Sequence, residues 1–278
     1  MSAPAPSDAI LTLTGVRKRF GGVTAVGGVD MVVPRGSVMG LMGPNGAGKT
    51  SLVNAVTGFY VPDEGSVMLD GTELAGLAPH HISRHGVTRT YQNVRLLSGF
   101  TVLEQVVAGM YASRTASSLS SLVFWPRERR ERQECLARAD ALLERVGVTE
   151  RRELAETLPY GTQRRVEIAR ALATDPRLML LDEPTAGMNR EESVEIGELM
   201  HSIRADGCTV VVVEHNMRLI LDYCDEAYVM SFGEVLAHGT PQECVDDPAV
   251  QKAYFGKEED DASGIPALRE LRGDQGRP

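Results

Sequence analysis

The stretch Gly43-Pro44-Asn45-Gly46-Ala47-Gly48-Lys49-Thr50 is the most informative part of this sequence. It matches the pattern G-x-x-x-x-G-K-[ST]. Glycine lets the main chain pass close to an anion, and the amide groups at the start of a helix complete an anion nest. Lys49 would reach the outer phosphates of a nucleotide, and Thr50 would offer its hydroxyl to Mg²⁺. The stretch therefore predicts a site for the phosphates of Mg-ATP.

The segments on both sides of this loop have the pattern that such a loop requires. Residues 38–42 form a short apolar run that ends at a glycine, which is typical of a buried parallel strand, and residues 49–56 have a helical pattern. We expect further strands at residues 10–13, 29–33, 65–69, 87–91, 178–181, 209–213 and 227–230. Helices such as residues 191–203 alternate with these strands, so the sequence predicts an α/β fold with a sheet that is covered on both faces.

The pattern changes between residues 102 and 173, where strand signals give way to helical spacing such as Leu136, Ala139 and Leu143. We therefore expect a helical subdomain at about residues 100–165, inserted in a domain that spans residues 10–256. Residues 1–9 are rich in Ala, Pro and Ser and are expected to be disordered. Residues 257–278 are expected to form a polar tail, in which residues 266–271 have a helical pattern of one or two turns.

Two adjacent carboxylates follow the apolar run at residues 178–181. In parallel sheets the carboxyl ends of the strands are where ligands bind. Asp182 is suited to hold Mg²⁺, directly or through water, and Glu183 is suited to orient the attacking water. Alone, the pair would equally fit a strand followed by a helix cap; together with the phosphate loop, it predicts nucleotide hydrolysis.

Three weaker signals gain meaning only from their positions. Gln92 follows a predicted strand, and by itself it would be a surface residue. His215 follows another predicted strand, where a lone histidine is more often structural. Phe20 precedes Gly21 and Gly22 and would otherwise be taken as a core residue.

Composition and charge exclude several other classes of protein. The 278 residues carry a formal net charge of −9, which disfavours nucleic acid as the main partner because nucleic-acid binders usually present a basic face. The four cysteines have no metal-ligand spacing and fit a reducing compartment. Neither a signal peptide nor an apolar run long enough to span a membrane is expected, so any membrane role would come through a partner.

The segment Leu158-Pro159-Tyr160-Gly161-Thr162-Gln163-Arg164-Arg165 is similar to the signature sequence of ATP-binding cassette (ABC) ATPases. The phosphate loop, Gln92, this signature, the Asp182–Glu183 pair and His215 follow one another in the order of that family. The resemblance covers roughly residues 10–256. It implies a P-loop NTPase core with an N-terminal antiparallel β subdomain and an inserted α-helical subdomain.

The resemblance also implies roles for individual residues. Phe20 would stack on adenine, Gln92 would sense the Mg²⁺ and water site, and His215 would contact the γ-phosphate. Gly161 would bind the γ-phosphate of ATP held by a second subunit, in trans. The expected catalytic residues are thus Glu183, His215, Gln92 and Lys49, and the expected Mg²⁺ ligands are Thr50, Gln92 and Asp182. The expected ATP-binding residues are Phe20, Gly43, Pro44, Asn45, Gly46, Ala47, Gly48, Lys49, Thr50, Ser51 and Gly161.

Some positions depart from the usual family pattern. Pro159 and Tyr160 stand where the signature has Ser and Gly, Thr162 stands where it has Gln, and Asn189 stands where the D-loop usually has Asp. These departures put the strength of the trans contact in doubt. These segments and the C-terminal run at residues 239–256 are similar to the corresponding segments of the ATPases of branched-chain amino-acid importers, the Liv-type family. Importers of urea or short-chain amides and exporters of lipopolysaccharide or lipid stay open as alternatives, and a soluble ABC protein of DNA repair or translation is disfavoured.

The resemblance implies an assembly. We expect two transmembrane permease subunits, a second ABC ATPase subunit that is identical or related, and indirectly a solute-binding protein outside the membrane. The chain would then lie on the cytoplasmic face of the cell membrane as a peripheral subunit, without nucleic acid as a partner.

Overall fold

The computed structural model describes residues 8–113 and 126–255, and these residues contain two β-sheets. The first is antiparallel, with the order β2-β1-β4-β5. The second has the order β10-β9-β3-β8-β7-β6; neighbours from β9 to β6 are parallel and β10 is an antiparallel edge strand. The strands are β1 (Ala9–Phe20), β2 (Val23–Pro34), β3 (Val38–Met42), β4 (Glu64–Leu69), β5 (Thr72–Glu73), β6 (Val87–Arg89), β7 (Leu178–Asp182), β8 (Thr209–Val213), β9 (Glu226–Ser231) and β10 (Glu234–Gly239).

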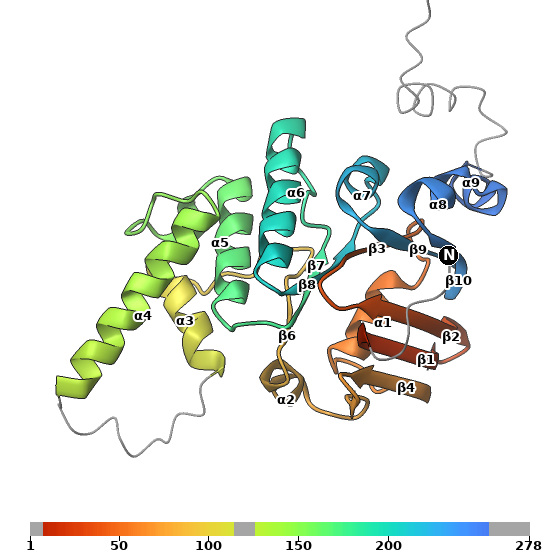
Figure 1. Cartoon of the computed structure of the whole chain (residues 1–278), viewed down its shortest axis with the longest axis horizontal. Coiled ribbons are helices and arrows are strands. Elements are labelled where there is room, and N and C mark those ends of the chain that lie inside the picture. Colours follow the sequence, from red (N-terminus) through yellow and green to blue (C-terminus); the bar gives the residue numbers. More distant parts are fainter. Residues whose placement is uncertain (1–7, 114–125, 256–278) are drawn as a thin grey trace, which may run out of the picture.

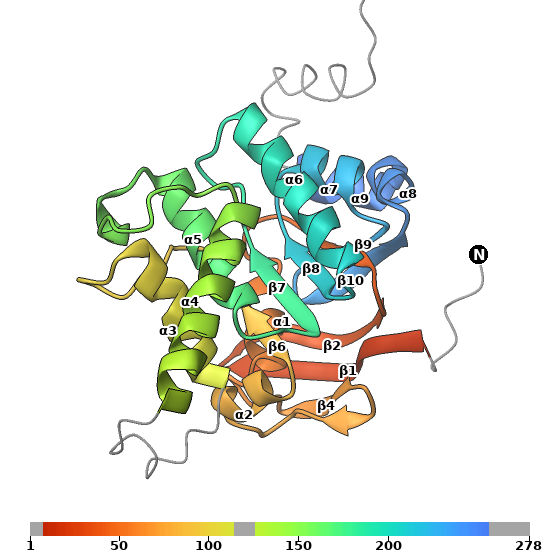
Figure 2. The same cartoon turned by 60° about the vertical axis from the view of Figure 1, so that its left-hand side comes forward.

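Helices make up much of the rest of the described residues. They are α1 (Lys49–Val56), α2 (Pro79–Arg84), α3 (Val102–Ser113), α4 (Pro126–Arg145), α5 (Tyr160–Leu172), α6 (Arg190–Ala205), α7 (Met217–Tyr223), α8 (Pro241–Asp246) and α9 (Pro248–Phe255), with a 3₁₀ turn at Ala155–Thr157. Figures 1 and 2 show α3, α4 and α5 grouped at one end, away from the antiparallel sheet at the other. Within the described ranges, no helix is both long and apolar enough to cross a membrane.

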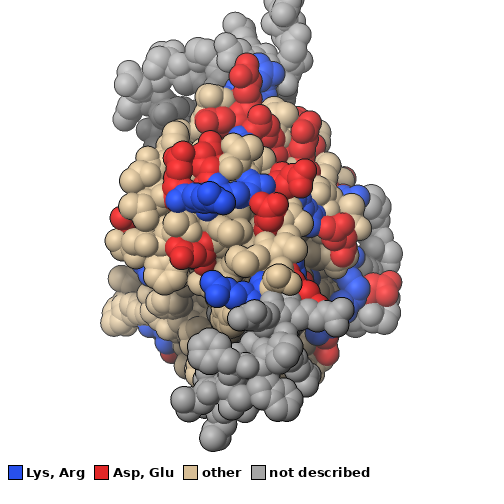
Figure 3. Space-filling view, turned by 90° about the vertical axis from the view of Figure 1, so that its left-hand side faces the viewer, with Lys and Arg blue, Asp and Glu red and all other residues tan. Residues whose placement is uncertain are grey.

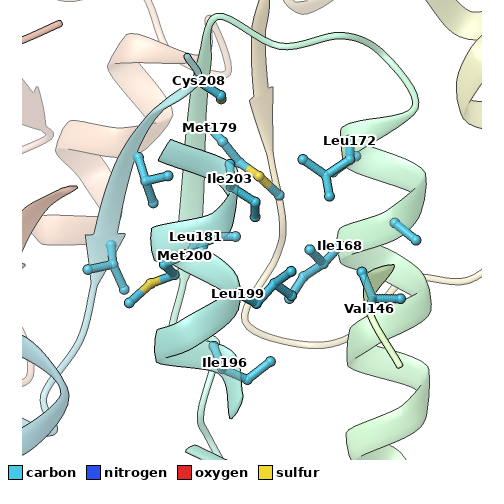
Figure 4. Close-up of a cluster of buried hydrophobic side chains, with 14 of the residues drawn as sticks. Val146, Ile168, Leu172, Met179, Leu181, Ile196, Leu199, Met200, Ile203 and Cys208 are labelled. Atoms are coloured by element: carbon cyan, nitrogen blue, oxygen red, sulfur yellow. The ribbon is translucent and has the colours of Figure 1, made fainter. Parts of the chain in front are cut away.

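The parallel sheet separates two hydrophobic cores. Successive side chains of a strand point to opposite faces. Met179 and Leu181 therefore join the core beneath α3 to α9, whereas Leu178 and Leu180 join the core shared with α1 and the antiparallel sheet. Figure 4 shows the first core between α5, α6 and β7, where Leu181 lies near Met200 and Leu199. Burial on both faces explains why these strands are continuous apolar runs.

The surface over the helical end carries charges of both signs. Figure 3 shows Lys and Arg side chains intermingled with Asp and Glu on this face, without a continuous basic patch. On α4 and the segments next to it, Arg138 is paired with Asp175 and Arg151 with Asp140. The visible face is therefore a mixed, solvated surface rather than one built for a polyanion.

Several boundaries differ from the sequence-based expectations. β1 begins at Ala9 and runs to Phe20, beyond the expected end at residue 13, because its charged second half pairs with β2 on a partly exposed sheet. β6 ends at Arg89 rather than at Tyr91. Helix α5 begins at Tyr160, so Gly161 lies within its first turn. The expectations for residues 1–7 and 257–278 lie outside the described residues.

Asn189, one of the departures from the family pattern, is the N-cap of α6. Its side-chain oxygen accepts a hydrogen bond from the Glu192 amide at 2.9 Å, and the Glu192 carboxylate accepts one from the Asn189 amide at 2.9 Å. This reciprocal capping box satisfies two amide groups at the start of the helix. Since Asn and Asp are equally good N-caps, the replacement keeps the structural role of this position.

We predict that Asn189→Ala lowers the free energy of unfolding by about 1 kcal/mol, because the Glu192 amide loses its acceptor. Asn189→Asp should stay within about 0.5 kcal/mol of the wild type. Urea denaturation followed by circular dichroism measures both. Arg190→Ala, at the next exposed position, is the control; equal losses for Asn189→Ala and Arg190→Ala would contradict a specific capping role.

Candidate functional site

Four predicted site segments meet at one edge of the parallel sheet. The phosphate loop follows β3, Gln92 follows β6, Glu183 follows β7 and His215 follows β8. The strands are aligned so that Leu41 and Asp182 both pair with Val213. Because parallel strands in this register end together, residues far apart in the sequence are brought to the same carboxyl edge.

The phosphate loop has a main-chain path that requires glycine at its ends. Gly43 and Gly48 have φ angles of 146° and 99°. A Cβ atom on Gly43 would lie 2.2 Å from the Met230 carbonyl oxygen, and one on Gly48 would lie 2.3 Å from the Ala25 carbonyl oxygen. The loop is thus packed against β9 and β2 on one side, while Asn45, Gly46 and Thr50 are exposed on the other. Helix α1 follows with neither a side-chain cap nor an acidic residue in its first turn, so its amide groups can receive an anion.

Lys49 lies buried beneath this loop. Its ammonium group donates to the carbonyl oxygens of Gly43 at 2.6 Å and Pro44 at 3.1 Å. Burial lowers the pKa of Lys49 below its usual value, and the charges of Glu183 and Asp182 oppose this shift only in part. A phosphate group would stabilise the charged ammonium, because an opposite charge favours the ionised form.

Glu183 is the point at which three of the predicted catalytic side chains meet. One carboxylate oxygen accepts a hydrogen bond from the Gln92 side-chain amide at 2.9 Å, and the other lies 3.6 Å from Nδ1 of His215. The φ angle of Glu183 is 46°, a left-handed conformation that is uncommon for a residue with a side chain. Such conformations persist where the surrounding structure enforces them, and they gather at functional sites.

Asp182, the expected Mg²⁺ ligand, is buried and paired with a buried arginine. Arg89 donates to Oδ2 of Asp182 at 2.7 Å, and both side chains are almost fully excluded from solvent. Arg89 also bonds the side chain of Asn54 in α1. The carboxylate is therefore held in a fixed orientation beside the phosphate loop.

Phe20 lies at the end of β1 and is partly exposed. Its ring packs edge-to-face against Tyr60, with 4.9 Å between the ring centroids. The contact between Ala25 and Gly48 places the β1–β2 hairpin beside the phosphate loop. Phe20 thus offers an exposed aromatic surface on this hairpin, and its stacking on adenine stays a prediction.

Gly161 lies on a different element from the phosphate loop. It is in the first turn of α5, where an added Cβ would meet a Glu192 carboxylate oxygen at 3.1 Å. The adjacent Tyr160 is exposed, lies near Gly187, and donates from its hydroxyl to the Gln92 carbonyl oxygen at 3.3 Å. The structure therefore joins the signature segment to Gln92, and the contact of Gly161 in trans stays a prediction.

Besides Arg89, two further buried residues of the site escaped sequence analysis. Glu214 is fully buried; it accepts from the amide and hydroxyl of Thr185 at 3.1 and 2.7 Å and from the His215 amide at 3.2 Å, so it ties the loop after β7 to the loop after β8. Arg164 is also fully buried. Both were visible beside recognised motifs, but charged residues are rarely buried, and a single sequence gives no sign of such burial.

The residues present fit a nucleotide with Mg²⁺. The loop offers amide groups and a buried ammonium to phosphate oxygens, while Thr50 and Asp182 offer the hard oxygen ligands that Mg²⁺ prefers. In the described ranges, no group of three or more His, Cys, Asp or Glu side chains could hold a metal ion by itself. A cation that takes most of its ligands from phosphate and water is consistent with this arrangement.

Comparison with family models supports the same assignment. A model described as ABC transporter matches residues 26–186, which include the phosphate loop, Gln92, Gly161 and the Asp182–Glu183 pair. A second model, described as branched-chain amino acid ATP-binding cassette transporter, matches residues 234–260.

Individual relatives are similar over most of their length. The chain is 42% identical over 253 residues to BraF of Pseudomonas aeruginosa, a high-affinity branched-chain amino acid transport ATP-binding protein; the match covers 90% of this chain and 99% of BraF. It is 40% identical to LivG of Escherichia coli, which carries the same description, with the same coverage. It is 33% identical to LptB of Haemophilus influenzae, a lipopolysaccharide export system ATP-binding protein, over 90% of this chain and 98% of LptB.

Solved structures agree with the sequence matches. The ADP conformation of MJ1267, an ATP-binding cassette of an ABC transporter, superimposes with a TM-score of 0.78 at 31% identity and covers 89% of this chain and 99% of that one. The resemblance inferred from the motifs and the α/β fold expected from the strand pattern are thereby confirmed. This chain belongs to the family of ABC transporter ATP-binding cassettes.

Proposed function

We propose that this cassette binds and hydrolyses Mg-ATP as the motor subunit of an importer. The observation that carries the proposal is the meeting of Lys49, Glu183, Gln92 and His215 at one sheet edge. In phosphoryl transfer the protein contributes mainly positioning and charge stabilisation. A phosphate cradle with a carboxylate and two polar side chains beside it provides both.

Each residue of the site has a separate task in this proposal. Lys49 and the amide groups of the loop neutralise charge on the phosphates, and Thr50, Gln92 and Asp182 hold Mg²⁺. Glu183 orients and polarises the attacking water, with Gln92 fixing one of its oxygens. His215, which is exposed beside Glu183, is free to reach the γ-phosphate.

We infer that two cassettes complete each site. Gly161 lies in the first turn of α5, which has no side-chain cap, and its neighbour Tyr160 is exposed. A γ-phosphate from a second subunit would bind the amide groups of this turn at the helix N-terminus. ATP-driven association and separation after hydrolysis would then act on two permease subunits at the cytoplasmic face of the membrane.

The transported solute is proposed from the relatives. BraF and LivG, at 42% and 40% identity, serve branched-chain amino acid transport, and the C-terminal segment matches the corresponding family model. LptB, at 33% identity, leaves lipopolysaccharide export as the second candidate. Importers of urea or short-chain amides remain a further alternative. We propose branched-chain or other amino acids, delivered by a solute-binding protein outside the membrane.

We predict that Glu183→Gln lowers the ATP turnover number by at least about 100-fold, because water loses the carboxylate that orients it. ATP affinity should stay within about threefold of the wild type. The dimer should accumulate in the presence of ATP, because hydrolysis no longer separates its subunits. Phosphate release, calorimetric titration with Mg-ATP and light scattering measure these three properties. Glu198→Gln, an exposed position on α6, is the matched control. Normal turnover in Glu183→Gln would contradict the assigned role.

Asp182→Asn should impair both Mg²⁺ use and folding. The substitution leaves the buried guanidinium of Arg89 without its counter-charge, which costs about 3–5 kcal/mol of stability. It also raises the Mg²⁺ concentration needed for half-maximal hydrolysis. Thermal unfolding and a Mg²⁺ titration of turnover check the two effects. An unchanged Mg²⁺ requirement in a folded variant would remove Asp182 from the metal site.

Solute assignment can be tested in cells of the source strain that lack this chain. Uptake of radiolabelled leucine should be lost and should return with the wild-type chain but not with Glu183→Gln. Uptake of labelled urea should be unaffected. Loss of urea uptake alone, or a defect in lipopolysaccharide export with normal leucine uptake, would favour the corresponding alternative.

A further inference from the structure

Arg164 binds three segments of the site with one guanidinium group. Nη2 donates to the carbonyl oxygens of Gln92, Asp182 and Glu183 at 3.0, 3.2 and 2.8 Å. Nη1 donates to the Tyr91 carbonyl oxygen and, at 2.8 Å, to Glu167. The signature helix α5, the segment that carries Gln92 and the end of β7 are therefore joined at a single buried cation.

Glu167 completes the arrangement from the next turn of α5. It is 2% exposed, and its carboxylate is the counter-charge of Arg164. Its other oxygen faces the amides of Tyr91 and Arg95 at 3.5 and 3.4 Å, which are long contacts. A buried arginine is stable only where its charge is paired. Nη1 and Nη2 of Arg164 both donate hydrogen bonds, whereas its Nε has no partner among the described residues. The pair thus forms a connection whose geometry is tightly specified.

Tyr160 extends the same face of the helix. Its hydroxyl donates to the Gln92 carbonyl oxygen, which Arg164 also binds. Positions 160, 164 and 167 lie on one side of an α-helix, since residues three and four apart are neighbours. The aromatic residue that departs from the usual signature therefore adds a contact to the segment that carries Gln92.

We propose that Tyr160, Arg164 and Glu167 form a clamp that positions Gln92 and Glu183 relative to the signature helix. The clamp residues act through these two side chains and do not touch the reacting atoms. Arg164 binds the carbonyl oxygen of Glu183, whose φ angle is 46°, so it helps to hold Glu183 in this left-handed conformation. Movement of α5, when a second cassette binds at its N-terminus, would be transmitted directly to the residues that orient water.

The proposal can be tested with two matched double variants of the full chain. Arg164→Met with Glu167→Leu removes both charges of the clamp and keeps the side-chain volume, so no unpaired buried charge remains. Arg145→Met with Asp206→Asn removes another ion pair, one that joins α4 to the end of α6. Three properties are compared: ATP affinity, ATP turnover number and hydrogen exchange of peptides that cover residues 91–95.

For the clamp variant we expect ATP affinity within about twofold of the wild type, turnover reduced at least about tenfold, and exchange at residues 91–95 accelerated about tenfold. The control pair should leave all three within about twofold of the wild type. A purely structural role of the clamp would lower the melting temperature of the clamp variant without separating turnover from affinity. The control pair is partly exposed, so its removal should change the melting temperature little. Wild-type turnover and exchange in the clamp variant, or equal losses in both variants, would overturn the proposal.

Tyr160→Phe provides a second test at an exposed position, where misfolding is not a concern. Loss of the hydroxyl should lower turnover about twofold to fivefold and speed exchange at residues 91–95. Wild-type turnover and wild-type exchange in Tyr160→Phe would remove Tyr160 from the clamp. If the clamp double variant also failed to fold, this result for Tyr160→Phe would overturn the proposal. If the wild-type chain had no ATP turnover, the proposed function would be contradicted. Hydrogen exchange at residues 91–95 in the wild type and the variants would still show whether the clamp exists.

Discussion

The parallel register of β3, β8 and β7 is the constraint on which the site depends. Leu41 and Asp182 both pair with Val213, so the phosphate loop, Glu183 and His215 leave the sheet at the same level. The register in turn depends on burial, because each strand sends alternate side chains into one of two cores. A slip by one residue would exchange the two sets of side chains, and such a slip is strongly disfavoured where both faces are buried.

Much of this arrangement could be predicted from the sequence, and the exceptions have physical reasons. β3, α1 and β8 have the expected bounds because an apolar run ending at glycine and a helical pattern are local signals. The predicted end of β1 was wrong, because tertiary pairing makes a strand of Arg17, Lys18 and Arg19. Sequence motifs indicated Glu183, Gln92 and His215, whose hydrogen bonding and close approach are seen only in the folded chain. Arg89, Arg164 and Glu214 were missed because their importance comes from burial and long-range partners.

Buried charged side chains fix the positions of the site residues from the inner side of the site. Arg89 fixes Asp182, Arg164 holds the main chain at Glu183, and Glu214 binds the loops on which Glu183 and His215 lie. Each of these groups is excluded from water, so each depends on its partners being in place. The exposed side of the site is left to the phosphate loop, Gln92 and His215. Rigid support on the inner side and access on the outer side suit a site that a second subunit completes.

The strand order also has a consequence for synthesis. Val38 of β3 pairs with Val210 of β8, and Met39 pairs with Glu226 of β9, so both neighbours of this early strand lie near the far end of the chain. Pairing between such distant segments is slow to form and must wait until the later strands exist. The nucleotide loop emerges early from the ribosome, yet the strand that supports it gains its neighbours only when most of the chain has been made. A nascent chain that ends before β8 should therefore be unable to bind nucleotide.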